Sequence, residues 1–152
     1  MDLTCSYLER YRDYGLLIIR VGVGVVFMVH GWPKITGGAE MWTGLGGAMG
    51  VIGIGFAPAF WGFMAAFSEF FGGLLLALGL LARPAALFMC FTMVMATLVH
   101  VTGGDGFGTI SHPLKLIFVF AGLLLTGPGK YSIDAGLKSS LSTKKAAGSD
   151  TA

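Results

Sequence analysis

Four apolar stretches, each close to the roughly 20 residues that a transmembrane helix needs, limit most strongly how this chain can fold. They run over residues 16–35, 57–81, 85–101 and 110–126. Each stretch has residues that interrupt or end a helix near its end or directly after it: Pro33, the pair Arg83-Pro84, TGGDGFG at 102–108 and GPG at 127–129. Only 12% of the residues are charged, about half of what a soluble domain carries. The sequence therefore predicts an all-α fold, a four-transmembrane-helix bundle.

The two ends of the chain are more polar than its centre. The segment before Leu16 is polar and mixed in charge, and it lacks the short apolar core of a signal peptide, so we expect no cleavage. Residues 1–137 are predicted to form the membrane domain. The final stretch, KSSLSTKKAAGSDTA at 138–152, is predicted to be a disordered cytoplasmic tail.

The distribution of basic residues predicts the orientation. With four spans, one side of the membrane holds the N-terminal segment, the second loop and the tail, and these carry Arg10, Arg12, Arg83, Lys130, Lys138, Lys144 and Lys145. By the positive-inside rule this side is the cytoplasm, so both termini are predicted to be cytoplasmic. Lys34 then lies on the outer side, and Lys115 lies in the first turns of the last helix.

Both outer loops have unusual features. In residues 37–55, apolar side chains recur at helical spacing, at Trp42, Leu45, Met49 and Ile52, which predicts a short interfacial helix. The last helix, counted from Pro113, has only about 14 residues and spans about 21 Å, less than the hydrocarbon core. Either the loop before it dips below the outer surface, or the bilayer thins locally, or the helix runs past these boundaries and begins earlier than Pro113.

Ionisable residues interrupt all four apolar stretches. Arg20, His30 and Lys34 lie within a sector of about 80° on the first helix. The other helices contribute one or two groups each: Glu69, His100, and His112 with Lys115. A charge at the centre of a transmembrane helix costs about 2.5 to 3.5 kcal/mol on insertion scales, so Arg20 and Glu69 should face the bundle interior.

Glycines should let the helices approach and leave space beside Glu69, at Gly22, Gly24, Gly72, Gly73 and Gly79. We predict that Glu69 lies at the base of an outward-opening pocket completed by His30 and His100. Several alternatives remain open. Arg20 could extend to the cytoplasmic headgroups, Lys34, His100 and His112 could be ordinary interface residues, and Glu69 could form an internal salt bridge to Arg20 or Lys115.

Several segments, in order, resemble the DoxX family of small four-helix membrane proteins. They are LLIIRVGVGVVFMVHGWPKI at 16–35, FSEFFGGLLLALGLLARPAAL at 67–87, His100, and LLLTGPGKYSID at 123–134. The resemblance implies a location in the bacterial inner membrane. It also implies quinone-linked electron transfer, because relatives include the membrane subunit of a thiosulfate:quinone oxidoreductase. It supplies no established set of catalytic residues.

A quinone site needs an apolar slot open to lipid and a few groups that bind carbonyl oxygens and exchange protons. We assign proton exchange to Glu69, His30 and His100, and quinone binding to Arg20, Lys34, His112 and Lys115. Candidate walls are Phe27, Phe67, Phe70, Phe71, Met93 and Met95, although ordinary helix packing explains any one of them equally well. Electrons would come from a redox protein partner or directly from a substrate.

Other functional classes fit the sequence poorly. It has no G-x-G-x-x-G pattern, and GPGKY lacks the hydroxyl residue of a P-loop. Cys5 and Cys90 form no C-x-x-C motif, the histidines lack a metal-site spacing, and nothing indicates nucleic-acid binding. The leading prediction is a membrane subunit of a quinone-linked oxidoreductase. Its expected partners are the lipid bilayer and a redox protein, and the sequence leaves a homo-oligomer open. The alternatives are a non-catalytic anchor or assembly partner of a redox enzyme, and a small-molecule carrier.

Overall fold

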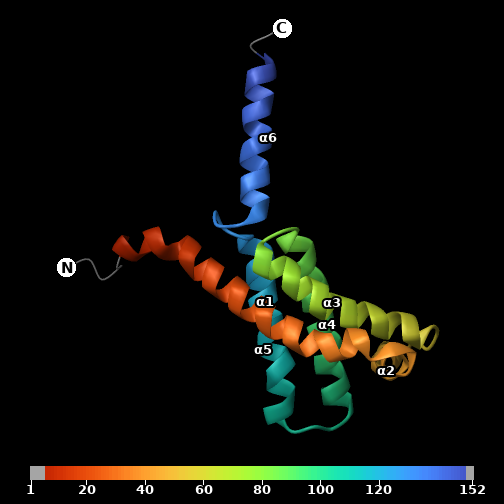
Figure 1. Cartoon of the computed structure of the whole chain (residues 1–152). Coiled ribbons are helices and arrows are strands. Elements are labelled where there is room, and N and C mark those ends of the chain that lie inside the picture. The colour runs from red at the N-terminus through yellow and green to blue at the C-terminus, as the bar shows by residue number, and fades with distance from the viewer. Residues whose placement is uncertain (1–5, 150–152) are drawn as a thin grey trace.

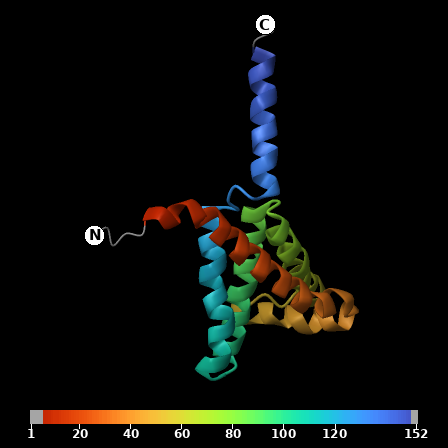
Figure 2. The ribbon, with the colours of Figure 1, turned by 60° about the vertical axis from the view of Figure 1, so that its left-hand side comes forward.

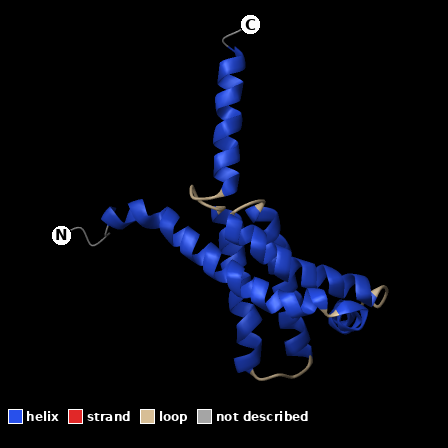
Figure 3. Ribbon diagram, viewed as in Figure 1, coloured by secondary structure: helices blue, strands red, loops and turns tan. Residues whose placement is uncertain are grey.

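The computed structural model describes residues 6–149, and every regular element in that range is helical (Figure 3). The elements are η1 (Ser6–Tyr11), α1 (Arg12–Thr36), α2 (Gly38–Gly46), η2 (Gly47–Ile52), α3 (Pro58–Leu78), α4 (Ala82–Thr102), α5 (Phe107–Thr126) and α6 (Ile133–Ser149). Helices α1, α3, α4 and α5 are long and apolar enough to cross a membrane. The predicted all-α class with four membrane-length helices is therefore confirmed.

Helix boundaries near prolines differ from those predicted. Helix α5 begins at Phe107, six residues before Pro113, and its 20 residues span about 30 Å. The alternative of an earlier helix start is correct. The helix is long enough to cross the hydrocarbon core without a contribution from the preceding loop. Helix α4 begins at Ala82, so Pro84 lies in the first turn, where its missing N–H costs no hydrogen bond. Helix α1 continues past Pro33 to Thr36.

Glycines bring α1 and α3 into close contact. A Cβ added at Gly24 would lie 2.5 Å from the carbonyl oxygen of Gly73, and one at Gly31 would lie 2.5 Å from the backbone nitrogen of Phe70. Gly24 and Gly31 are seven residues apart and therefore share one helix face. Gly22 was also expected at a helix contact, but it has open space around its Cα instead.

Helix α2 is the short helix predicted in the first outer loop, and it lies across one end of α3 (Figure 2). The indole Nε1 of Trp42 donates a hydrogen bond to the carbonyl oxygen of Lys34 at 2.9 Å. The Trp42 ring also packs edge-on against Phe63, with centroids 5.0 Å apart. These contacts tie α2 to the ends of α1 and α3. Its location at the membrane surface stays a prediction.

The opposite end of the bundle gathers the start of α1, the turn between α3 and α4, and the connection after α5; we call it the basic end. The Asp134 carboxylate accepts hydrogen bonds from the backbone N–H groups of Leu81 and Ala82, at 2.9 and 3.1 Å. The Asp13 carboxylate accepts one from the N–H of Lys130 at 3.0 Å. With four spans, the start of α1, the α3–α4 turn and the connection after α5 must lie on the same side of the membrane. The side of the membrane on which it lies stays a prediction.

Helix α6 leaves the basic end and stands apart from the bundle (Figure 1). Disorder was expected from residue 138 onward, whereas the structure has helix as far as Ser149. The stretch contains no proline and holds leucine, lysine and alanine, which are good helix formers. Residues 150–152 and Cys5 lie outside the described residues.

Candidate functional site

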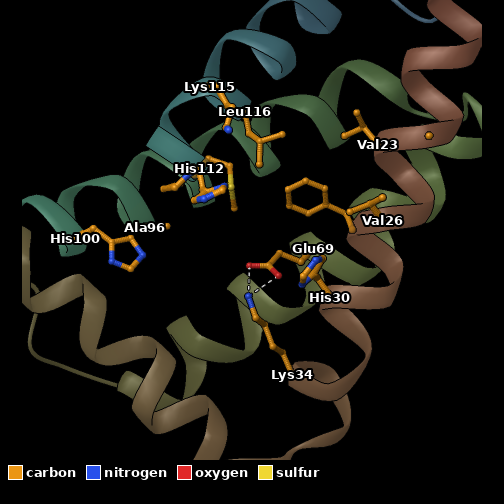
Figure 4. A pocket seen from close by; sticks show the side chains of 14 residues that line it. Val23, Val26, His30, Lys34, Glu69, Ala96, His100, His112, Lys115 and Leu116 are labelled. Carbon is orange, nitrogen blue, oxygen red and sulfur yellow. Dashed lines mark hydrogen bonds and ion pairs between the residues drawn. The ribbon is translucent and has the colours of Figure 1, made fainter. Parts of the chain in front are cut away.

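A polar pocket of about 640 Å³ lies between α1, α3, α4 and α5, at the end of the bundle away from the basic end (Figure 4). Its lining brings together six of the seven predicted site residues: His30, Lys34, Glu69, His100, His112 and Lys115. Glu69, His30 and His100 share one cavity, as expected from their positions along the helices. The roles assigned to them stay predictions.

Glu69 is buried at mid-helix on α3 and is paired with Lys34. The Lys34 ammonium donates to both carboxylate oxygens, at 2.7 Å to Oε1 and 2.6 Å to Oε2. The Glu69 side chain is 7% exposed and the Lys34 side chain is 32% exposed. Neither Arg20 nor Lys115, the partners considered from the sequence, forms this pair. Because the pair lines a cavity, the carboxylate stays accessible to a ligand.

Local packing explains why Lys34 reaches Glu69. Gly31 lets the last turns of α1 lie against the backbone of Phe70, directly beside Glu69 in α3. The hydrogen bond from Trp42 to the Lys34 carbonyl then fixes this end of α1 against α2. The pair therefore depends on three helices, of which α1 and α3 supply the charges.

His100, in the last turn of α4, contacts a residue that the sequence analysis did not identify. Its Nδ1 lies 2.7 Å from Oδ2 of Asp105, in the turn between α4 and α5. A carboxylate at Nδ1 favours the tautomer that carries its proton there, which leaves Nε2 as the acceptor of a neutral ring. An acid five residues after a helix-terminal histidine, within a glycine-rich turn, is the signal that could have identified Asp105.

The pocket lining holds more basic residues than acidic ones. Glu69 is the one carboxylate in its lining, and Lys34 already neutralises it. Within residues 6–149, His30, His112 and Lys115 have no hydrogen-bond or ion-pair partner, and all three are exposed on the cavity or its rim. Figure 4 shows His112 and Lys115 on α5, across the cavity from the pair. The arrangement suits an electron-rich oxygen on a ligand.

The apolar part of the lining differs partly from the predicted walls. Phe27 and Met93 line the pocket, together with Val26 and Leu116. The remaining predicted walls, Phe67, Phe70, Phe71 and Met95, are not in its lining. Phe67 and Phe71 stack on each other along the exposed face of α3, and Phe70 packs against Trp32. A stripe of aromatic residues on α3 alone did not indicate which of them faces the interior.

Arg20 is the seventh predicted site residue, and the structure does not bring it to the pocket. It points into the bundle, as predicted, and is 1% exposed. Its Nη1 donates to the carbonyl oxygens of Leu76 and Ala77 at 2.9 and 2.8 Å, and its Nη2 donates to that of Tyr131 at 2.6 Å. Arg20 thus links α1 to the C-terminal end of α3 and to the segment after α5.

Within residues 6–149 no three side chains of His, Cys, Asp and Glu come together as a metal site. Cys90 is a free thiol in α4, with Sγ 3.8 Å from the carbonyl oxygen of Ile117. The six polar residues of the pocket are therefore the main chemical feature of the described structure.

Comparison with known proteins gives consistent matches along most of the chain. The DoxX family profile matches residues 15–101. "Inner membrane protein YqjF" of Escherichia coli is 34% identical over 131 residues, covering 84% of this chain and 95% of that protein. "Inner membrane protein YphA" of the same organism is 30% identical, covering 82% and 96%.

A third relative carries a name that refers to an activity. "Putative oxidoreductase CatD" of Bacillus subtilis is 28% identical over 122 residues, covering 80% of this chain and 86% of that protein. No solved structure matches the chain.

Proposed function

This chain belongs to the DoxX family, and we propose on that premise that it is a multi-pass inner membrane subunit of a quinone-linked oxidoreductase. The observation that carries the proposal is a pocket that joins a buried Glu69–Lys34 pair to three basic residues, His30, His112 and Lys115, which have no partner within residues 6–149. The name of the Bacillus protein CatD points to the same class of activity.

The residues of the pocket fit a quinone head. The cavity volume of about 640 Å³ lies within the range of small-molecule sites. Phe27, Met93 and Leu116 supply apolar walls for a flat ring, while His112 and Lys115 supply donors for a carbonyl oxygen. A wholly polar or wholly apolar ligand would leave one of these two sets unsatisfied.

Each polar residue then has a distinct role. Lys115 and His112 bind and orient a carbonyl oxygen, and the positive charge of Lys115 stabilises the negative charge that an oxygen gains on reduction. Glu69 holds or releases a proton, and Lys34 keeps its carboxylate at the cavity wall. His30 and His100 relay protons between this carboxylate and the outer surface. A bound quinone supplies the redox chemistry, accepting electrons and protons together.

The electrons come from a redox protein partner or from a reduced substrate. The part of the pocket lining that α4 and α5 supply is apolar at Met93, Ala96 and Leu116. A donor would approach from the outer end, where His100 and His112 lie near the turn between α4 and α5.

The test is quinone binding by the purified chain in lipid nanodiscs. Quinone quenching of tryptophan fluorescence should give saturable binding of a decyl-tailed benzoquinone, because Trp32 lies between the pocket residues His30 and Lys34 in α1 and Trp42 donates to the Lys34 carbonyl oxygen. Lys115→Gln should weaken this binding at least tenfold. Lys130→Gln, a matched change at the basic end, should leave it unchanged. Absence of saturable binding by the wild-type chain would contradict the proposal.

Helix α6 favours a second candidate function, that of a membrane anchor for a redox enzyme. It projects from the basic end and exposes Leu137 and Leu141, 53% and 68% accessible, on neighbouring turns of one face. A photo-crosslinking residue at position 141 tests this candidate in cells. A crosslink to a redox enzyme, with no quinone bound by the purified chain, would favour the anchor over the quinone-binding subunit.

A further inference from the structure

A second cavity of about 650 Å³ lies beside the polar pocket, between α1 and α5. Its walls include Ile19, Gly22 and Val23 of α1 and Phe118, Gly122 and Leu123 of α5. The lining contains no charged side chain, and Thr126, at its far end, is its one polar side chain. We call this cavity the α1–α5 groove.

The groove and the polar pocket adjoin each other and share part of their walls. Gly22 and Val23 line both cavities. From this junction the polar pocket extends along α1 toward Lys34, and the groove extends the other way toward Leu16. Leu16 to Val23 corresponds to about 10 Å of helix. A single ligand could thus place a polar head in one cavity and an apolar chain in the other.

The groove exists because the backbones of α1 and α5 stay apart. Their neighbours in the bundle are α3 and α4, respectively, and α1 meets α5 mainly where the rings of Phe27 and Phe120 touch edge-on at 5.2 Å. Phe120 is fully buried in the core and does not line the groove. Ile18 and Phe118, at the rim of the groove, are about 70% exposed, so the groove opens on the lateral surface of the bundle, which faces away from the core.

The lack of side chains at two glycines keeps the groove empty of protein atoms. A Cβ added at Gly22 or at Gly122 would have no heavy atom within 4 Å. Gly24, two residues after Gly22, has instead the backbone of α3 against it. Helix packing therefore does not require glycine at positions 22 and 122, where the missing side chains leave the groove open.

We propose that the α1–α5 groove binds the isoprenoid tail of the quinone whose head occupies the polar pocket; this rests on the proposed function. An apolar chain gains little by leaving lipid for an apolar groove, because lipid solvates it equally well. Attachment to a head held by Lys115 and Glu69 changes this, since the chain then binds without a separate loss of translational freedom. The groove thereby selects tailed quinones over tail-less ones.

Substitutions that fill the groove test the proposal in nanodiscs. Gly122→Phe fills it without touching the polar pocket, because Gly122 lines the groove alone. Gly108→Phe is the matched control, since Gly108 also lies in α5 with open space around it and lines neither cavity. The probes are a decyl-tailed benzoquinone and the same benzoquinone head without a tail.

The wild-type chain should bind the tailed quinone at least tenfold more tightly than the tail-less head. Gly122→Phe should abolish this preference and leave the affinity for the tail-less head unchanged, and Gly108→Phe should behave like the wild type. Should Gly122→Phe fail to fold, the smaller change Gly122→Leu with its control Gly108→Leu repeats the test at a position that lines the groove alone.

Three results would overturn the proposal. Equal affinity of the wild type for both probes would remove the tail site but leave the quinone head in its pocket. A preference for the tailed probe that survives Gly122→Phe, with loss of co-purified phospholipid, would assign the groove to a lipid acyl chain. Failure of both probes to bind the wild type would reject the proposed function and the tail site together.

Discussion

Lys34, in the last turn of α1, donates to both carboxylate oxygens of Glu69, in the middle of α3, at 2.7 and 2.6 Å. The pair forms where Gly31 lets the two helices approach, and it lines the polar pocket rather than filling it. A buried carboxylate is thereby neutralised without being withdrawn from a ligand.

The ion pair should show strong coupling in a double-mutant cycle. Lys34→Met leaves the Glu69 carboxylate buried without a partner and should lower the free energy of unfolding by about 1–3 kcal/mol. Lys34→Met with Glu69→Gln should recover most of that loss, because no unpaired charge remains. Thermal and denaturant unfolding in detergent measure both. Additive losses in the double variant would show that the pair is not coupled.

Arg20 is expected to be a positioning residue. Arg20→Lys cannot bind the carbonyls of both α3 and Tyr131, so it should cost at least about 2 kcal/mol of unfolding free energy. Arg83→Lys is the control, because the exposed Arg83 makes one long hydrogen bond, 3.4 Å to the Leu125 carbonyl. Quinone affinity of the folded Arg20→Lys protein should match the wild type. Normal stability with lost affinity would instead support the role in quinone binding that the sequence suggested.

Gly31 should be intolerant of any side chain. Gly31→Ala places a methyl group against the backbone of Phe70 and should cost about 1–3 kcal/mol, because α1 must move away from α3. Gly22→Ala, on the same helix but in open space, should be neutral or stabilising by up to about 1 kcal/mol. Equal unfolding midpoints for the two variants would contradict the described contact between α1 and α3.

The topology prediction places both termini in the cytoplasm, because the start of α1, the α3–α4 turn and the segment after α5 share the basic end. Alkaline phosphatase fused after Ala152 should be inactive, while green fluorescent protein at the same position should fluoresce. Strong phosphatase activity would reverse the assigned orientation.

Much of the fold could be predicted from the sequence, because length, hydropathy and the positions of charges constrain a membrane protein strongly. The periodicity of apolar and ionisable residues was enough to predict that Glu69, His30 and His100 face one cavity. Boundaries near Pro84 and Pro113 were less predictable. A proline in the first turns of a helix resembles one that precedes it, and only tertiary packing distinguishes the two.

The pairing within the site could not be predicted. Arg20, Lys34 and Lys115 are all cations on helices that face Glu69, and their distances from it depend on how closely each helix approaches α3. Gly31 favours Lys34, whereas the carbonyls at the end of α3 engage Arg20. The contact of Asp105 with His100 depends likewise on the shape of a four-residue turn.

The central claim is that Glu69 exchanges a proton with a quinone bound in the polar pocket. Infrared difference spectroscopy of the nanodisc-embedded chain, recorded while a bound decyl-tailed benzoquinone is reduced electrochemically, tests it most directly. We predict a carboxyl band that appears or disappears on reduction, is absent from Glu69→Gln and is retained by Phe70→Leu, since Phe70 lies outside the pocket lining. The same band in Glu69→Gln, or reduction of bound quinone with no carboxyl signal in the wild type, would contradict the claim.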